Sequence, residues 1–319
     1  MRINFGYVAM STILQDCSPS KTITVKNLSR IADEKLRIIK LRSLAKTNLN
    51  NIQRLFFHNK SHDITVFRLT SKLIPLATHP IAQNWDWASE LAYELQSLGA
   101  YARENHFRLS AHPDHFTLLN SPKEEILTAS IKDLEYHHQI FKAMGLDSSA
   151  KLVIHVGGRY EDKDLSMERF INNHHNLPLH LKNRIILEND DKIYTSRDVL
   201  KICQELKIPM VLDIHHHWCN NYNDDIGNYL PAIFDTWKDE PIPPKIHLSS
   251  PRDQKHFRNH ADNIDLPFFL EFLEKAKKVN QDFDVMIEAK NKDGALFQLM
   301  RELKEISRVK FINEASVEA

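Results

Sequence analysis

The sequence predicts a single (β/α)8 barrel, in which eight parallel strands alternate with helices. Short apolar runs alternate with amphipathic segments along the whole chain, and no linker-like segment interrupts them. Nearly every apolar run stops at His, Asp or Glu. A doubly wound open sheet is the competing architecture, but it would not need eight such units ending in polar residues. We expect residues 1–319 to form one domain with a frayed tail at about 310–319.

The expected strands are short continuous apolar runs, which are typical of parallel strands buried on both faces. In chain order they are Ile3–Ala9, Ile64–Leu69, Phe107–Pro113, Lys151–Gly158, Ile185–Asp190, Met210–His215, Lys245–Ser250 and Val285–Lys290.

The expected helices show apolar residues at helical intervals. They are Val25–His58, Trp85–Glu104, Ser121–Met144, Asp164–Asn173, Thr195–Leu206, Asp225–Trp237, Leu266–Lys278 and Asp293–Ile306. The third of these has the strongest start signal, because Pro122 would occupy its first position, followed by Glu124 and Glu125.

Composition narrows the function classes. Of the 319 residues, 42% are hydrophobic and 26% charged, and 42 basic residues balance 42 acidic ones. There is no apolar run long enough to span a membrane, and the first ten residues are too short and polar to act as a signal peptide. Three scattered cysteines predict a reducing, cytoplasmic location rather than a disulfide framework. Only 7 glycines occur and no phosphate-binding glycine motif, whereas 18 histidines are present.

The segment Ile185–His217 carries the clearest chemical signal. Two apolar runs within it end at a carboxylate, Glu188 in the first and Asp213 in the second, and His216 follows three residues later. Residues just past a barrel strand face the mouth of the barrel, where active sites lie. A carboxylate in that position is a poor packing choice unless a cation sits above the strand ends.

The other strand ends repeat this pattern. A single histidine beside an apolar run is more often a hydrogen-bonded core residue, but seven polar strand ends in a row are not expected by chance. Imidazole and carboxylate ligands without thiolate favour Zn²⁺, Mn²⁺ or Fe²⁺. The set is large enough for two or three ions, an arrangement used for phosphodiester hydrolysis; sugar isomerases are an alternative, but generally use fewer histidines. The candidates are His79, His112, His155, Glu188, Asp213, His216, Lys245, His247, His260 and Glu288.

Eight motifs in these positions resemble the UV damage endonuclease family, whose relatives include the endonuclease IV type of abasic-site nuclease. The resemblance covers essentially the whole chain, and LENDDK and PKIHLSSP are its most specific runs. The motifs are FGYV (5–8), LIPLATHP (73–80), LSAHPDHF (109–116), IHVGG (154–158), LENDDK (187–192), LDIHHH (212–217), PKIHLSSP (244–251) and MIEAKNK (286–292).

The resemblance implies a TIM-barrel DNA repair enzyme with a three-ion cluster, commonly of Mn²⁺, with Zn²⁺, Mg²⁺ or Fe²⁺ as alternatives. Such an enzyme nicks double-stranded DNA immediately 5′ of cyclobutane dimers and 6-4 photoproducts, leaving a 3′-hydroxyl and a 5′-phosphate. The family roles carry over as follows: one ion on His112, His155 and Glu188; a second on Glu188, Asp213, His247 and Glu288; and a third on His216 and His260.

The resemblance assigns further catalytic roles to Lys245, a position that the family can carry as a carbamate, and to His79, close to the cluster. Nearby cations disfavour a protonated lysine, and a neutral amine could add carbon dioxide and become an anionic ligand. An ordinary phosphate-contacting lysine is the equally weighted alternative.

Lesion recognition in the family uses two residues inserted into the duplex, often a Gln and an aromatic. The matching positions are His115, which departs from Gln, and Phe116, with packing in the following helix as the alternative for Phe116. Tyr7 matches a family aromatic near the lesion, and a structural role is the equally weighted alternative for this residue. Arg252 and Lys255 are candidate DNA contacts, as are Arg159, Lys163 and Arg258.

Three other functions remain open from the residues alone: an abasic-site endonuclease, a metal-dependent sugar isomerase, and a non-catalytic metal-binding or DNA-binding protein. We expect damaged double-stranded DNA as the partner, a monomeric protein, no membrane association and no obligate protein partner.

Overall fold

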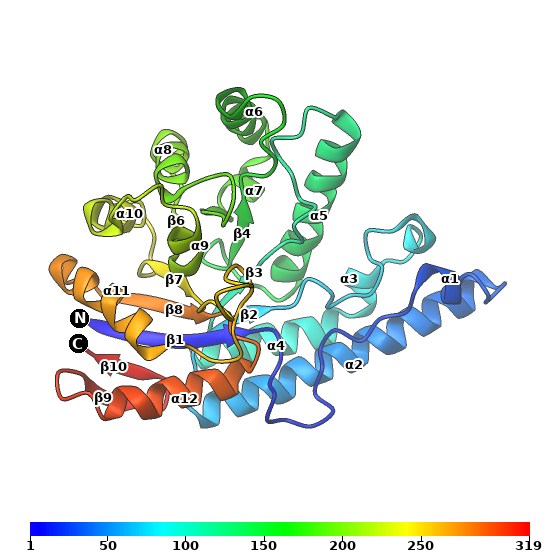
Figure 1. The fold of residues 1–319 in the computed structure, drawn as a ribbon. Helices are drawn as coiled ribbons and strands as arrows, with labels where there is room; N and C mark the ends of the chain where they lie inside the picture. Colours follow the sequence, from blue (N-terminus) through cyan, green and yellow to red (C-terminus); the bar gives the residue numbers. More distant parts are fainter.

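The computed structural model describes residues 1–319 and confirms the predicted barrel (Figure 1). Each of the eight parallel strands pairs with the next one along the chain, and the eighth strand pairs with the first, which closes the sheet into a barrel. The strands are β1 (Arg2–Val8), β2 (Val66–Leu69), β3 (Arg108–Ala111), β4 (Lys151–His155), β5 (Ile185–Glu188), β6 (Met210–Asp213), β7 (Lys245–Leu248) and β8 (Phe283–Ile287).

Closure requires a glycine at the junction of β1 and β2. Gly6 is the partner of Val66 across these strands. A Cβ atom at position 6 would lie 1.9 Å from the Val66 carbonyl oxygen, well inside van der Waals contact. Only glycine permits this close approach of the two backbones.

The helices surround the barrel, and none is long and apolar enough to cross a membrane. Most crossovers have the helices that were expected, with ends shifted by a few residues. The helices and 3-10 turns are α1 (Val25–Leu28), α2 (Glu34–Ser61), η1 (Pro80–Ala82), α3 (Trp87–Glu90), α4 (Ala92–Glu104), α5 (Glu124–Ala143), α6 (Lys163–His175), α7 (Leu179–Lys182), α8 (Ser196–Leu206), α9 (Ile214–Cys219), η2 (Ile226–Asn228), α10 (Leu230–Asp235), α11 (Leu266–Val279) and α12 (Lys292–Lys304).

Three expected helices are interrupted. The first breaks between α1 and α2, where the Asp33 side chain accepts backbone N–H groups and starts a new helix. The second breaks at Leu91, between α3 and α4, and the segment Asp225–Trp237 divides into η2 and α10. The predicted start of α5 at Ser121 is also wrong, because the helix begins at Glu124 and Pro122 lies before it.

The expectation of a frayed tail is wrong. Strands β9 (Lys310–Asn313) and β10 (Ser316–Glu318) form an antiparallel hairpin, and β10 pairs with Arg2–Asn4 of β1. Since β2 pairs only with Gly6–Val8, the first half of β1 has an open edge, which β10 covers. Val317 is 1% exposed, so the tail adds to the core.

Side chains close the amino end of the barrel. Trp237 packs with Val153, Ile186 and Val211 in a small buried cluster. Beside it, Arg108 lies over the Trp237 ring and forms an ion pair of 2.6 Å with Asp284. This end is therefore a filled floor, which leaves the carboxyl ends of the strands as the face available for a functional site.

A buried histidine on α6 makes the fold sensitive to acid. His174 is 3% exposed, neither ring nitrogen has a hydrogen-bond partner, and burial lowers its pKa to about 4. The unfolded chain, with a His pKa of about 6.5, binds the proton more readily, so stability falls as the pH drops through this window by at most about 1.4 kcal/mol per pH unit.

When the pH is lowered from 7.5 to 5, we predict that the free energy of unfolding falls by about 2 kcal/mol less in His174→Leu than in the wild type. Urea unfolding in the presence of a chelator measures this difference without a contribution from bound metal. His175→Leu, which changes the exposed neighbour, should behave like the wild type. Equal pH dependence in all three proteins would contradict the role of His174.

Candidate metal centre

The barrel brings seven predicted ligand residues together at the carboxyl ends of its strands. Strand pairing sets His155 opposite Glu188 and Asp213 opposite His247. His112 and Glu288 follow directly after β3 and β8, respectively. Their ligand atoms form three overlapping groups, each within 4.8 Å: His112, His155 and Glu188; Glu188, Asp213 and His216; and Glu188, His247 and Glu288.

Glu188 is common to all three groups, and its two oxygen atoms face different partners. Oε2 lies 3.1 Å from His112 Nε2 and 3.8 Å from His155 Nε2. Oε1 lies 3.0 Å from His247 Nδ1 and 3.4 Å from His216 Nδ1. The carboxylate is 1% exposed, so it is held at the centre of four imidazoles. This is the arrangement required of a carboxylate that bridges two cations.

Two further carboxylates approach the same centre. Glu288 Oε1 lies 3.0 Å from His247 Nδ1, and Arg68 on β2 forms an ion pair with the same carboxylate. Asp213 Oδ2 lies 3.8 Å from His216 Nδ1. Three carboxylates in a buried mouth would repel one another strongly unless cations or protons separate them.

The pKa shifts show how the protein balances this charge without metal. Burial disfavours both glutamates, but His247 and His155 around Glu188, and Arg68 beside Glu288, outweigh burial and hold both pKa values well below the usual range. Burial raises the pKa of Asp213, and the charges of Glu188 and Glu288 raise it further.

The carboxylates also raise the pKa values of two histidines. Burial opposes the charged form of both rings, but Asp213 and Glu188 raise the pKa of His216 well above its ordinary value, and Glu188 and Glu288 raise that of His247. A metal ion binds the neutral imidazole, so its binding would displace protons from these rings and would weaken as the pH falls.

Unpaired buried atoms indicate that the residues fit a metal. The Nε2 atom of His247 and the Asp213 Oδ2 atom are buried without a hydrogen-bond partner. Buried polar atoms are normally satisfied, and each exception needs a reason. Nitrogen and carboxylate oxygen atoms converging without thiolate suit Mn²⁺, Zn²⁺ or Fe²⁺. The cluster can therefore hold divalent metal.

The grouping around the second ion differs from the one predicted. Asp213 was assigned to it with His247 and Glu288, but the structure groups Asp213 with His216 instead. The reason is local: Asp213 caps α9, and its Oδ1 atom accepts the His216 N–H at 2.7 Å. His260 lies outside the three groups. Its ring centre is 6.1 Å from that of His216, and its Nδ1 donates to the Glu288 carbonyl oxygen at 2.7 Å.

The two histidines that flank His216 point away from the cluster. They lie on the short helix α9, and helical rotation separates neighbouring side chains. His215 contacts Ser249 Oγ at 2.8 Å and the Phe257 carbonyl oxygen at 2.7 Å, so both of its nitrogens are used. His217 contacts Ser196 Oγ at 3.0 Å.

Lys245 is buried in the barrel interior, two residues before His247. Burial and the charges of Arg108 and Arg68 hold its pKa well below the usual value. Its neutral amine is the form that a carbamate requires, and the surrounding arginines favour an anion there. The carbamate itself stays a prediction.

Two predicted site residues lie away from the cluster. The His79 Nδ1 accepts the Ile81 N–H at 3.1 Å and caps η1, and no hydrogen bond or ion pair joins it to the cluster. Tyr7 is fully buried, donates to Asn59 Oδ1 at 2.7 Å and packs edge-on against Phe67. The expected lesion contact of Tyr7 is therefore corrected: it is a core residue.

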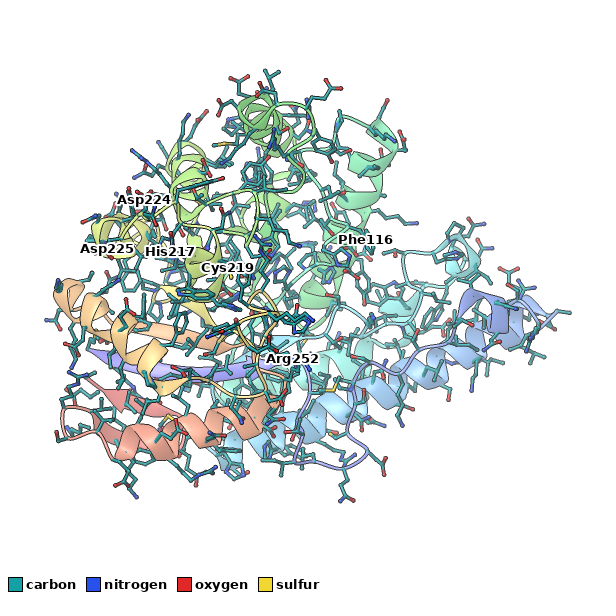
Figure 2. All side chains as sticks on the ribbon, in the orientation of Figure 1. Phe116, His217, Cys219, Asp224, Asp225 and Arg252 are labelled. Carbon is teal, nitrogen blue, oxygen red and sulfur yellow. The ribbon has the colours of Figure 1, made fainter.

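Two of the predicted DNA contacts, Phe116 and Arg252, lie on loops that follow β3 and β7 (Figure 2). Phe116 is 71% exposed, which excludes the alternative of core packing, and its ring lies 4.1 Å from that of His115. Arg252 and Lys255, in the loop after β7, are also exposed. Lys163 and Arg258 are instead engaged by Asp198 and Asp191, respectively.

An open cavity of about 510 Å³ joins part of the cluster to these loops. Its lining includes His112, His155 and Glu288, together with His115. On the side of β1 and β2 it is bounded by Ser20, Arg68 and Lys72. The cluster is thus accessible to a large substrate from the mouth of the barrel.

Sequence reasoning missed two residues that support the cluster. Arg68 neutralises Glu288, and its signal was a charged residue in the middle of the buried strand VFRL. Asn189 exchanges hydrogen bonds with the Asp213 backbone, at 3.0 Å and 2.9 Å, and fixes the end of β6. Nothing in the sequence separates Asn189 from an ordinary loop asparagine.

We predict that Asp213→Asn weakens metal binding but does not lower the stability of the protein measured with a chelator. Without metal, the variant should be as stable as the wild type or up to about 1 kcal/mol more stable, because one of three crowded carboxylates is removed. Mn²⁺ at a hundred-fold excess over Kd should stabilise the wild type by about 2.7 kcal/mol and the variant by less than half of that.

Thermal unfolding with chelator and with Mn²⁺ measures both quantities. Asp239→Asn, at an exposed position, is the control and should match the wild type in each. An equal Mn²⁺ effect in Asp213→Asn would show that this carboxylate holds no metal.

Comparison with known proteins identifies one family over nearly the whole chain. The family model described as UV-endonuclease UvdE matches residues 3–318. A UV DNA damage endonuclease from Bacillus mycoides (strain KBAB4) is 44% identical over 318 residues, covering 100% of both chains. One from Bacillus cereus (strain 03BB102) is 42% identical with the same coverage.

Solved structures give the same family and a wider fold group. The crystal structure of SacUVDE superposes with a TM-score of 0.83 at 32% identity, covering 96% of this chain and 99% of that one. Endonuclease IV from Thermus thermophilus, at 14% identity, shares the fold with a TM-score of 0.57, covering 95% of this chain and 99% of that one. The chain therefore belongs to the UV damage endonuclease family of DNA repair enzymes.

Proposed function

We propose that this enzyme hydrolyses the phosphodiester immediately 5′ of a UV photoproduct in double-stranded DNA, leaving a 3′-hydroxyl and a 5′-phosphate. Two or three divalent ions, with Mn²⁺ preferred, would occupy the cluster. The observation that carries this proposal is the Glu188 carboxylate, whose two oxygens face separate pairs of imidazoles in a buried, accessible mouth.

The residues of the cluster divide the work. Bound ions at this position would activate water and stabilise charge on the leaving 3′ oxygen. Glu188 would fix their separation, and Arg68 holds the Glu288 carboxylate in place. His216, with His260 beside it, would form the third ligand group. All of these residues come from one chain, and we expect a monomer acting on cytoplasmic DNA.

Recognition would depend on the exposed pair His115 and Phe116. An apolar ring inserted between base steps is favoured where stacking is already weakened, as it is at a damaged site. Asp114, 2.7 Å from the His115 ring, sets the charge at this tip. We therefore expect this pair to contribute to lesion selectivity rather than to bond cleavage.

We predict that the protein with Mn²⁺ nicks UV-irradiated supercoiled plasmid and leaves untreated plasmid intact. Glu188→Gln should lower nicking at least about a thousand-fold, since the bridge between ions is lost. Gel separation of nicked and supercoiled DNA gives the rate, and metal analysis of the same samples gives ion occupancy.

Glu168→Gln is the matched control, because it makes the same change at an exposed position on α6 and should leave activity unchanged. A fully active Glu188→Gln protein with full metal content would remove the bridging role. Nicking of duplexes with an abasic site but not of irradiated DNA would favour an abasic-site endonuclease. The position of the nick on an end-labelled duplex distinguishes the 5′ side of the lesion from the 3′ side.

We predict that Phe116→Ala lowers kcat/KM on irradiated duplex about ten-fold or more, from the loss of roughly 1 to 3 kcal/mol of stacking. Phe116→Tyr, which keeps the ring, should restore most of it. Mn²⁺ binding should be the same in all three proteins. Equal kcat/KM for the alanine variant and the wild type would exclude the wedge.

A further inference from the structure

The helix α2 is much longer than the other crossover helices. It has 28 residues, against 20 in α5, 14 in α11 and 13 in α4, α6 and α12. At 1.5 Å per residue this is about 42 Å, about 12 Å longer than α5 and about twice the length of the 13-residue helices. Its last residue, Ser61, lies close to the start of β2, so the extra length lies at the amino end of the helix. Figure 1 shows α1 and the first turns of α2 projecting beyond the barrel.

The projecting end lies on the functional face of the molecule. Crossover helices run antiparallel to the strands, so their amino ends lie at the carboxyl ends of the strands, where the cluster is. The chain leaves β1 at this face and reaches α1 through residues 9–24. The segment Lys21–Lys46, called the basic arm below, therefore stands beside the mouth of the barrel.

The basic arm carries an unusual charge. It contains eight Lys or Arg residues and two acidic residues, in a chain whose formal net charge is zero. The rest of the chain therefore has the opposite net charge, and positive charge is concentrated in this one projection. A charge asymmetry of this kind marks a binding surface more often than a structural need.

Some of these cations are already engaged. Arg42 pairs with Glu90 at 3.1 Å, Lys46 pairs with Glu94 at 2.7 Å, and Arg37 donates to backbone carbonyls of the arm itself. The remaining five are exposed and form no ion pair: Lys21, Lys26, Arg30, Lys35 and Lys40.

The two acids in the arm do not neutralise the free cations. Asp33 accepts backbone N–H groups at the start of α2, and Glu34 accepts from Asn84 at 2.8 Å. The five cations are thus available for an external anion. Because these side chains are long and exposed, their charges avoid the desolvation penalty of a buried charge.

A groove connects the arm to the catalytic cluster. The open cavity that contains His112 and Glu288 extends to Ser20, the residue before the arm, and to Lys72. A polyanion lying across the cluster and continuing along this cavity would arrive at Lys21.

We propose that the basic arm binds the phosphate backbone of the DNA duplex that flanks the lesion, on the β1 and β2 side of the barrel. This inference rests on the proposed function. Phosphate contacts of Lys and Arg position a protein on DNA without reading sequence, which suits an enzyme that must find lesions in any sequence. Exposed, flexible lysine side chains suit such contacts with phosphate groups.

The test compares two triple variants that remove the same charge. Lys26→Gln/Arg30→Gln/Lys35→Gln changes the arm. The control, Lys278→Gln/Arg301→Gln/Lys304→Gln, changes exposed cations near the carboxyl ends of α11 and α12, on the face of the barrel away from the cluster. Fluorescence anisotropy with undamaged duplex of about 30 base pairs gives Kd as a function of salt.

The arm variant should raise Kd about ten-fold near physiological salt and reduce the slope of log Kd against log salt by about 2 to 3, since each lost phosphate contact contributes about 0.9. The control variant should stay within about two-fold of the wild type in Kd, with the same slope. Nicking of irradiated plasmid at saturating enzyme should persist in both, which also shows that both are folded.

The outcomes separate the two proposals. A wild type that nicks irradiated plasmid, with an arm variant that matches the control in Kd and slope, would overturn the role of the arm alone. A wild type that neither binds duplex DNA nor nicks irradiated plasmid would overturn the proposed function, and the arm inference with it. Loss of affinity and slope confined to the arm variant supports the proposal.

Discussion

The site depends on one buried carboxylate. Glu188 ends a strand in the barrel, is 1% exposed, and is surrounded by His112, His155, His216 and His247. A buried carboxylate is costly unless positive groups compensate it. The strand pairing that sets Glu188 beside its neighbours, and the filled floor at the amino end of the barrel, both hold this carboxylate at the level where the ligands meet. Divalent cations would supply this compensation, and the carboxylates also raise the pKa values of His216 and His247, which favours positive charge on these two rings.

This balance links stability to function. Three neighbouring carboxylates repel one another, and His247 Nε2 and Asp213 Oδ2 are buried without a hydrogen-bond partner; divalent ions held by these residues would offset both costs. The carboxylates of the cluster therefore repel one another at a position where apolar side chains would pack without any such repulsion. In the proposed function, the positive charge that binds the DNA backbone lies on the basic arm. The arm is away from the cluster, so its cations do not compete with the metal ions.

Much of this could be predicted from the sequence, because barrel strands are continuous apolar runs and their ends mark one face. That logic gives the eight strands and brings Glu188, Asp213 and Glu288 together. It could not place Tyr7, because alternate inward and outward positions on β1 look alike when both are buried. The regrouping of Asp213 with His216 depends on helix capping after β6, and the ordered tail depends on the open edge of β1. Both are tertiary effects that no local pattern reports.

The most direct measurement of the central claim is anomalous diffraction from crystals of the protein grown with Mn²⁺. The geometry predicts at least two anomalous peaks in contact with Glu188, one on the His112 and His155 side at Oε2 and another on the His247 and Glu288 side at Oε1. A single peak, or peaks that do not contact Glu188, would contradict the bridging carboxylate on which this account of the enzyme depends.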